Sequence, residues 1–317
     1  MALSVQENAE MQRARSPLAR KLDDGFVWLT GLFGVGVAGV LLAIAWRVGI
    51  EALPAMQKFG LGFLTSSRWD PVEDIYGALP QIYGTMISAC IALLIALPIG
   101  LGVAIFLSED FLPPRVQRPI VFMVELLAAI PSVVYGLWGI FVLTPLLRSF
   151  GLALNQGLSW IPLFSTRPTG PGIYVAGVIL AIMILPIIAA ISRDALVAVP
   201  PELRQAAYGL GATRWETLLK VMLPAAFSGI VGGTMLALGR AMGETMATTM
   251  VIGNANKINL SIFDQGSTVA SLLANQFAEA SGLQVSSLMY AAFILFLMTL
   301  VVNILAELVV RRVRMKV

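Results

Sequence analysis

Six long apolar stretches constrain the fold of this chain more than any other feature. A bilayer core is about 30 Å thick, so an α-helix needs about 20 apolar residues to cross it. The stretches span residues 26–46, 79–107, 120–147, 172–191, 225–252 and 286–310. Backbone polar groups find no water in lipid, so each stretch must satisfy them within a helix. Together with 58% hydrophobic residues, this pattern predicts an all-α integral membrane protein with six transmembrane helices.

The distribution of basic residues predicts the orientation. The first stretch is too long for a signal peptide core, and no cleavage site follows it, so we expect a retained anchor. With the amino terminus inside the cell, the inner segments hold 14 of the 21 Lys and Arg residues and the outer segments hold 6, with Arg240 inside a span. Because basic residues favour the cytoplasmic side, both termini are expected there.

Several functions are disfavoured by what the sequence lacks. One cysteine and no histidine exclude a Cys/His metal cluster, and we expect no metal site. No G-x-x-x-x-G-K-[ST] phosphate loop is present, so the chain is not expected to bind or hydrolyse nucleotide or to act as an enzyme by itself. The basic residues are dispersed over four inner segments, and no nucleic-acid partner is expected.

Prolines lie inside three of the stretches, at Pro98, Pro131, Pro145 and Pro186. Each lacks a backbone donor and can bend its helix. Simple kinking for packing is one interpretation, and a broken helix that lines a path is the other. Pro131, with Ser132 and Tyr135 after it, is the best candidate for such a break and a weaker candidate for the translocation path.

The fifth stretch carries two charges in apolar surroundings, Arg240 and Glu244. Their spacing places them on one helical face with several glycines, where Glu244 is expected to pair with Arg240. A buried Arg is costly in a membrane, so the pair either fixes helix register or serves an anionic cargo. The donors of an Arg suit an oxyanion, and we favour Arg240 and Glu244 as path residues. Glu125 is a weaker candidate, because it lies close to the cytoplasmic end of its stretch.

A polar segment between the fourth and fifth stretches carries a recognisable motif. It contains Gln205-Ala206-Ala207, then Gly211, then Val221-Met222-Leu223-Pro224. This spacing resembles the coupling loop of ABC-importer permeases, although Gln205 and Val221 stand where Glu and Ile are usual. The segments at residues 126–136 and 239–247, with the outer residues 69–70 and 74–78, resemble more narrowly the permeases of bacterial phosphate importers.

The resemblance implies a fold and a set of partners. It implies a MetI-like core of five helices over residues 79–310, with the cytoplasmic coupling loop at 193–224. Before the core come a cytoplasmic segment (1–25) and an extra helix with an external segment (26–78), and a basic tail (311–317) follows it. The implied partners are a second permease, two ATPase subunits that use ATP and Mg, and an external phosphate-binding protein. The implied location is the bacterial cytoplasmic membrane.

Two surfaces of this arrangement have local signals of their own. The coupling loop is amphipathic, and Gly211 would permit a sharp turn between two short helices; the loop could also simply lie on the membrane. On the outer side, residues 268–280 are expected to form a short helix whose apolar side contacts the binding protein or the second permease, or forms a lid.

Other functions remain open at this point. The sister permease of a phosphate importer, or a permease for sulfate or molybdate, would share most of these features. An ion-coupled transporter should show more acids inside the membrane than Glu125 and Glu244. A passive channel or a structural membrane subunit is the remaining alternative.

Overall fold

The computed structural model describes residues 17–109 and 111–314, and it divides the chain into two units at Ile50 and Glu51. The described part of the first unit is the beginning of helix α2 (Pro17–Phe59), and most of its described side chains are exposed. Helix α2 continues through Pro54 to Phe59, well beyond the predicted end at residue 46. Ala52 and Ala55 explain this extension, because both are buried in an apolar cluster of the second unit.

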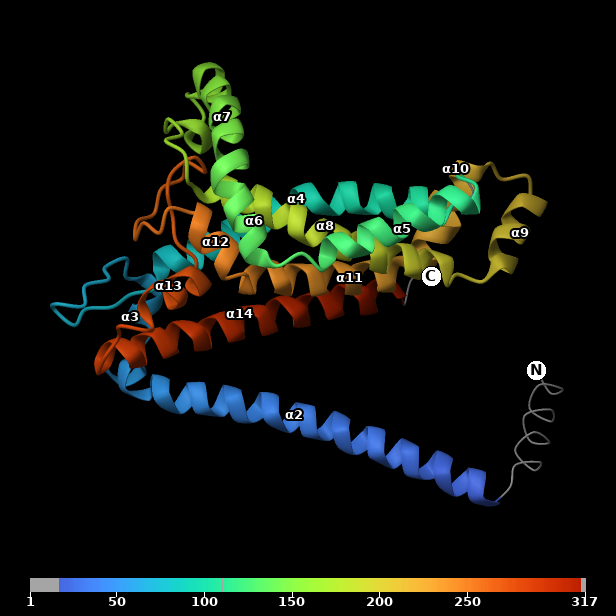
Figure 1. The fold of residues 1–317 in the computed structure, drawn as a ribbon, viewed down its shortest axis with the longest axis horizontal. Helices are drawn as coiled ribbons and strands as arrows, with labels where there is room; N and C mark the ends of the chain where they lie inside the picture. Colours follow the sequence, from blue (N-terminus) through green and yellow to red (C-terminus); the bar gives the residue numbers. More distant parts are fainter. Residues whose placement is uncertain (1–16, 110, 315–317) are drawn as a thin grey trace. The chain divides into compact units, whose positions relative to one another are not determined.

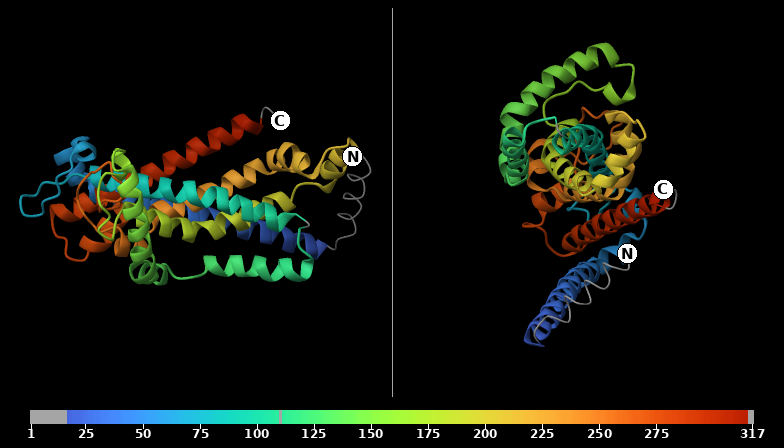
Figure 2. Two further views of the ribbon diagram at one scale, coloured as in Figure 1. Left: turned by 90° about the horizontal axis from the view of Figure 1, so that it is seen from above. Right: turned by 90° about the vertical axis from the view of Figure 1, so that its right-hand side faces the viewer.

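Long helices that lie side by side form the centre of the second unit (Figures 1 and 2). These are α4 (Leu79–Ser108), α8 (Ile173–Val197), α11 (Leu223–Gly243) and α14 (Leu283–Arg314). Helix α8 is the most buried, and small residues let its neighbours approach it closely. A Cβ at Gly177 would meet Ile91 of α4 at 2.5 Å, and one at Gly233 would meet Ile191 at 2.8 Å. Pro98 and Pro186 lie inside α4 and α8, and neither ends its helix.

The third apolar stretch is broken, so the single helix expected over residues 120–147 is wrong. Helix α5 (Pro114–Ala128) runs along the bundle, and after the break come α6 (Ser132–Trp138), a π-helical turn η1 (Gly139–Leu143) and α7 (Thr144–Leu158). Both views show α6 and α7 running across the direction of α4 and α8 (Figures 1 and 2). Pro131 has extended backbone before α6, which is where the broken-helix interpretation expected the interruption.

The fifth stretch also differs from the single helix expected over residues 225–252. Helix α10 (Arg214–Thr217) continues through a π-helical turn η3 (Leu218–Met222) directly into α11. Helix α11 then ends at Gly243, and a separate short helix, α12 (Met246–Val251), follows. The π-turns η1 and η3 each end two residues before a proline, Pro145 or Pro224, whose missing N–H disturbs the regular hydrogen-bond ladder.

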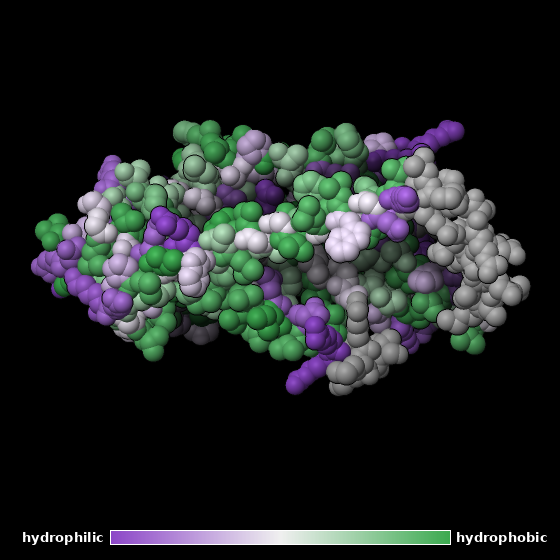
Figure 3. Space-filling model, turned by 90° about the horizontal axis from the view of Figure 1, so that it is seen from below, coloured by the Kyte–Doolittle hydropathy of each residue, from purple (hydrophilic) through white to green (hydrophobic). Residues whose placement is uncertain are grey.

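The short elements separate into two groups at opposite ends of the bundle (Figure 1). Helix α9 (Pro201–Gly209) and α10 lie at one end. At the other end lie α3 (Gly62–Thr65), the 3₁₀ turn η2 (Pro162–Phe164) and α13 (Val269–Gln276). Six helical stretches of the described chain are long and apolar enough to cross a membrane, as predicted. Apolar side chains cover much of the face drawn in Figure 3, and polar side chains gather at its left-hand end.

The segments at the second end pack into a cap. Phe63 stacks on Tyr290 with 4.5 Å between ring centroids, and Trp69 donates a 2.7 Å hydrogen bond to Gln276. Burial raises the pKa of the Asp264 carboxyl, but Lys257 at 2.9 Å and a hydrogen bond from Asn259 help to hold this pKa below its usual range.

Helix α13 confirms the short helix expected over residues 268–280, although it ends at Gln276. The apolar side of α13 is not the open docking face that was expected. Val269 and Leu272 are buried within the chain, against neighbouring elements of the same cap, while Phe277 beyond the helix is 45% exposed. The sequence pattern showed an apolar face but could not show that the chain itself covers most of it.

Candidate translocation path and coupling surface

The two broken stretches meet at their breaks. Helix α6 packs on α12, and Gly136 makes this possible because a Cβ there would lie 2.5 Å from the sulfur of Met250 and 3.3 Å from Cα of Ala247. Pro131 and Ser132 begin α6, and the Tyr135 hydroxyl donates a 3.0 Å hydrogen bond back to the Leu127 carbonyl at the end of α5. The Tyr135 side chain therefore connects the two ends of the break, where the helix itself is interrupted.

Arg240 and Glu244 lie at the second break, but they do not form the expected pair. Because α11 ends at Gly243, Glu244 has extended backbone and leaves the helical face that carries Arg240. The Glu244 carboxylate instead accepts a 3.2 Å hydrogen bond from the Ala247 backbone N–H, at the start of α12. A carboxylate is favourable at a helix amino terminus, so Glu244 stabilises the break.

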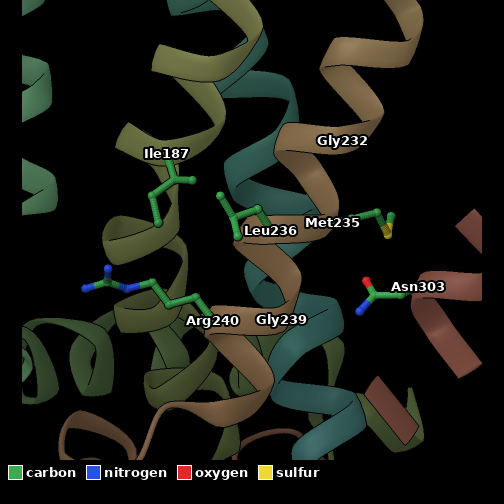
Figure 4. A pocket seen from close by; sticks show the side chains of 7 residues that line it. All are labelled: Ile187, Gly232, Met235, Leu236, Gly239, Arg240 and Asn303. Atoms are coloured by element: carbon green, nitrogen blue, oxygen red, sulfur yellow. The ribbon is translucent and has the colours of Figure 1, made fainter. Parts of the chain in front are cut away.

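The Arg240 side chain is exposed in this chain, and the described residues give it no ion pair. It lines an open cavity of 680 Å³ together with Gly232, Leu236 and Gly239 of α11, Ile187 of α8 and Asn303 of α14. Figure 4 shows the guanidinium extending away from α11, on the side opposite Asn303. Helix α6, which carries Tyr135, packs on α12 just beyond the end of α11, so the break at Pro131 and the break that follows Arg240 lie close together.

The glycines of α11 face two directions. Gly229 and Gly233 lie so close to α8 that a Cβ there would meet Ala195 at 2.5 Å and Ile191 at 2.8 Å. Around Gly232, Gly239 and Gly243 there is open space instead. The open glycines lie on or near the part of α11 that carries Arg240.

Glu125 lies apart from this region. It is exposed on α5 and lines a small cleft with Arg193 of α8, and the described residues give it no ion pair. Asn303, which lines the Arg240 cavity, was missed by the sequence reasoning. A polar amide inside the sixth apolar stretch was the signal that could have revealed it.

The coupling segment, residues 201–224, contains the sharp turn expected at Gly211. Helix α9 carries Gln205, Ala206 and Ala207 and ends with two backbone hydrogen bonds, from Ala212 to the Ala207 carbonyl and from Gly211 to the Tyr208 carbonyl. This is the Schellman arrangement, and it requires the positive φ of +83° that Gly211 adopts. Thr213 then caps α10 by a reciprocal pair of hydrogen bonds with Glu216.

The apolar side chains of the coupling segment divide between the core and the surface. Leu218 and Met222 are buried against α4 and α8, and Leu223 packs at the edge of the same cluster, just before Pro224. Leu210, Trp215 and Leu219 are 90%, 60% and 57% exposed. A groove of 540 Å³ runs over this surface and is lined by residues from both helices of the segment. The segment therefore presents apolar surface that the described residues of this chain leave uncovered.

Arg214 of α10 is partly exposed and also contacts residues that follow α4. Its guanidinium lies 4.0 Å from the centre of the Phe111 ring and 3.4 Å from a carboxylate oxygen of Glu109. Sequence reasoning missed Glu109 altogether. The available signal was an acidic residue directly after the second apolar stretch, in a region where basic residues predominate.

Comparison with known proteins places this geometry in a family. The model of the family described as "Binding-protein-dependent transport system inner membrane component" matches residues 96–315. The chain belongs to this family. The matched region holds the breaks, the Arg240 cavity and the coupling segment, and it confirms the resemblance drawn from the coupling motif.

Curated relatives of this family member cover nearly its whole length. The phosphate transport system permease protein PstC of Pasteurella multocida is 45% identical over 292 residues, which cover 90% of this chain and 91% of the relative. The PstC protein of Haemophilus influenzae is also 45% identical, covering 91% and 93%. A probable PstC of Methanocaldococcus jannaschii is 37% identical, covering 94% and 96%.

Solved structures show the same fold. An alginate ABC transporter in complex with its periplasmic protein matches 90% of this chain and 95% of its own chain, with a TM-score of 0.57 and 17% identity. The MetNI methionine ABC transporter matches 75% and 94%, with a TM-score of 0.51 and 18% identity. The fold is that of MetI-like ABC permeases, with an additional helix at the amino terminus.

Proposed function

We propose that the chain is the permease subunit of an ATP-driven importer that carries inorganic phosphate across the bacterial cytoplasmic membrane. The observation that carries this proposal is the set of relatives named as phosphate permeases, at 37–45% identity over about nine-tenths of the chain. Both termini and the coupling segment lie on the cytoplasmic side in this proposal, as the distribution of basic residues favours.

The geometry at the breaks supports an anionic cargo. Arg240 exposes a planar set of donors beside a 680 Å³ cavity, and the described residues place no carboxylate within ion-pair distance of it. Such a guanidinium can offer two parallel hydrogen bonds to an oxyanion. Arg240 lies near the end of α11 that is remote from the coupling segment. This position supports a role for Arg240 on a route between the two ends of the bundle.

The partners follow from the surfaces left open. The apolar groove on the coupling segment would bind an ATPase subunit. That subunit, rather than this chain, would bind ATP and Mg. The open glycine face of α11 would receive a second permease, completing the path around Arg240. A second ATPase subunit would serve that permease, and an external phosphate-binding protein would deliver cargo to the cap.

Two other interpretations also make the chain an importer permease, but they assign it a different subunit or a different cargo. The sister permease of a phosphate importer would give the same uptake but a different gene context, and a sulfate or molybdate permease would show a different cargo. The identity to phosphate permeases favours the proposal over both.

Uptake of radiolabelled phosphate in cells that lack other phosphate importers tests the cargo. Cells that express this chain with its neighbouring transport genes should take up phosphate, and excess sulfate or molybdate should not compete. Inactivation of the partner ATPase should abolish uptake. Competition by sulfate or molybdate, or uptake without a functional ATPase, would contradict the proposal.

A further inference from the structure

The carboxylate of Glu109 is buried and bound by two arginines. Glu109 is the C-cap residue directly after helix α4, and its side chain is 5% exposed. Arg204 of α9 donates a 2.8 Å hydrogen bond to one carboxylate oxygen, and Arg214 of α10 lies 3.4 Å from the other. The two arginines lie on opposite sides of the turn at Gly211, so one side chain at the end of α4 binds both helices of the coupling segment.

Aromatic side chains reinforce this attachment. Phe111 follows Glu109 in the chain, and the Arg214 guanidinium lies over its ring. Phe111 also stacks on Phe106 of α4 and contacts Trp215 of α10, with ring centroids 5.8 Å and 6.4 Å apart. The end of α4 is therefore joined to the coupling segment in two ways. Glu109 makes the charge contacts, and Phe106 and Phe111 make the ring contacts.

Burial makes the charge contact hard to break. A carboxylate removed from water is stable only when opposite charges and hydrogen bonds replace its hydration, and removal of one partner leaves a buried charge uncompensated. The exposed pair between Glu216 and Lys220 differs, because water screens it and it joins residues of one continuous helical stretch. Among the ion pairs of the described residues, only those of Glu109 combine two features. They contain a buried charge, and they join the coupling segment to the end of another long helix.

We propose that Glu109 is a positioning residue that transmits movement of the coupling segment to helix α4. This inference rests on the proposed function, since it requires an ATPase that moves the coupling segment. When the ATPase shifts α9 and α10, the two arginines carry Glu109 and the end of α4 with them. Without the carboxylate, the coupling segment would move while α4 lags behind.

The single cysteine of the chain provides a reporter that does not depend on cargo. Cys90 lies in α4 and is exposed in this chain, so an environment-sensitive fluorophore attached there reports on α4. The experiment uses the complex with cysteine-free partner subunits in lipid nanodiscs, with and without ATP and vanadate. The variants are Glu109→Gln, Arg204→Gln and, as a control, Arg311→Gln, which removes an exposed ion pair at the end of α14, outside the coupling segment.

The unaltered chain and Arg311→Gln should show an ATP-dependent fluorescence change at Cys90. Glu109→Gln should assemble and hydrolyse ATP but lose most of this change, and phosphate transported per ATP should fall about tenfold. Arg204→Gln should show a smaller loss, because Arg214 still binds the carboxylate.

Three results would overturn the inference. They are an unaltered response at Cys90 in Glu109→Gln, no response in the unaltered chain, and failure of both Glu109→Gln and Arg204→Gln to assemble, which would make the contact structural. A normal response at Cys90 in a complex that transports no phosphate would instead refute the proposed cargo and leave this inference standing.

Discussion

Single residues at the breaks and turns do most to shape the functional regions. Glu244 stands where the helix could have continued, and its carboxylate begins the next helix instead of neutralising Arg240. Arg240 is therefore left exposed to a cavity. Gly211 adopts a backbone conformation that other residues resist, and the two helices of the coupling segment take their directions from it.

Gly211→Val should damage coupling without preventing membrane insertion. A β-branched residue at φ +83° costs about 1–2 kcal/mol of local stability, so the Schellman turn should open. Phosphate uptake should fall while the ATPase subunit still hydrolyses ATP. Gly209→Ala is the matched control, since Gly209 is helical and a Cβ there meets nothing within 4 Å. Normal uptake by Gly211→Val would show that the turn is not required.

At the scale of elements, the two interrupted helices act as one unit. Helix α6 packs on α12, and the Tyr135 hydroxyl bridges the interruption between α5 and α6. Helices α4 and α11 both pack on α8, and α11 runs from the coupling segment to Arg240. The interrupted elements therefore lie beside the Arg240 end of α11.

Tyr135→Phe tests whether the hydrogen bond to Leu127 holds the break. Its loss should cost about 1 kcal/mol and leave a carbonyl at the end of α5 without its partner. Phosphate uptake should decrease while the amount of assembled complex stays unchanged. Tyr83→Phe removes a similar 3.0 Å hydrogen bond, to the Asn259 carbonyl, and should leave uptake nearly normal. Equal effects of the two substitutions would argue against a special role for the break.

The sequence predicted these elements only where a local pattern of residues determines the structure. Apolar length gave six spans, and turn chemistry gave Gly211 its conformation. Pro131 marked a possible interruption after Ala128. The interruption after Gly243 had no such signal, because the stretch around it is apolar enough overall for hydropathy to extend one helix through it. Packing of α6 on α12 stabilises both breaks, and it joins residues more than a hundred positions apart. Glu109 and Arg214 are similarly distant in sequence, so no local pattern pairs them.

At the scale of the whole molecule, the second unit has two different ends. The coupling segment lies at one end and the cap lies at the other (Figure 1). The family membership gives this division its meaning, because such permeases work as inner membrane components of binding-protein-dependent transport systems.

Cysteine labelling tests this orientation in intact cells that express the chain with Cys90→Ser. Ser67 and Ser281 are exposed at the cap, and Glu202 is exposed at the start of α9. An impermeant maleimide should label Ser67→Cys and Ser281→Cys from outside, and it should reach Glu202→Cys only after the cells are opened. Labelling of Glu202→Cys from outside would reverse the orientation of the chain.

The central claim is that Arg240 serves an anionic cargo rather than the fold. Uptake of radiolabelled phosphate by Arg240→Gln, with and without Glu244→Gln, tests it most directly, because the amide that replaces the Glu244 carboxylate could still accept the Ala247 hydrogen bond. Each variant should assemble normally. Loss of a charged hydrogen-bond donor should lower uptake roughly 10- to 150-fold in both Arg240→Gln and the double variant. Arg148→Gln, an exposed change in α7, should have little effect. Near-normal uptake by a well-assembled double variant would contradict the account and make Arg240 a structural residue.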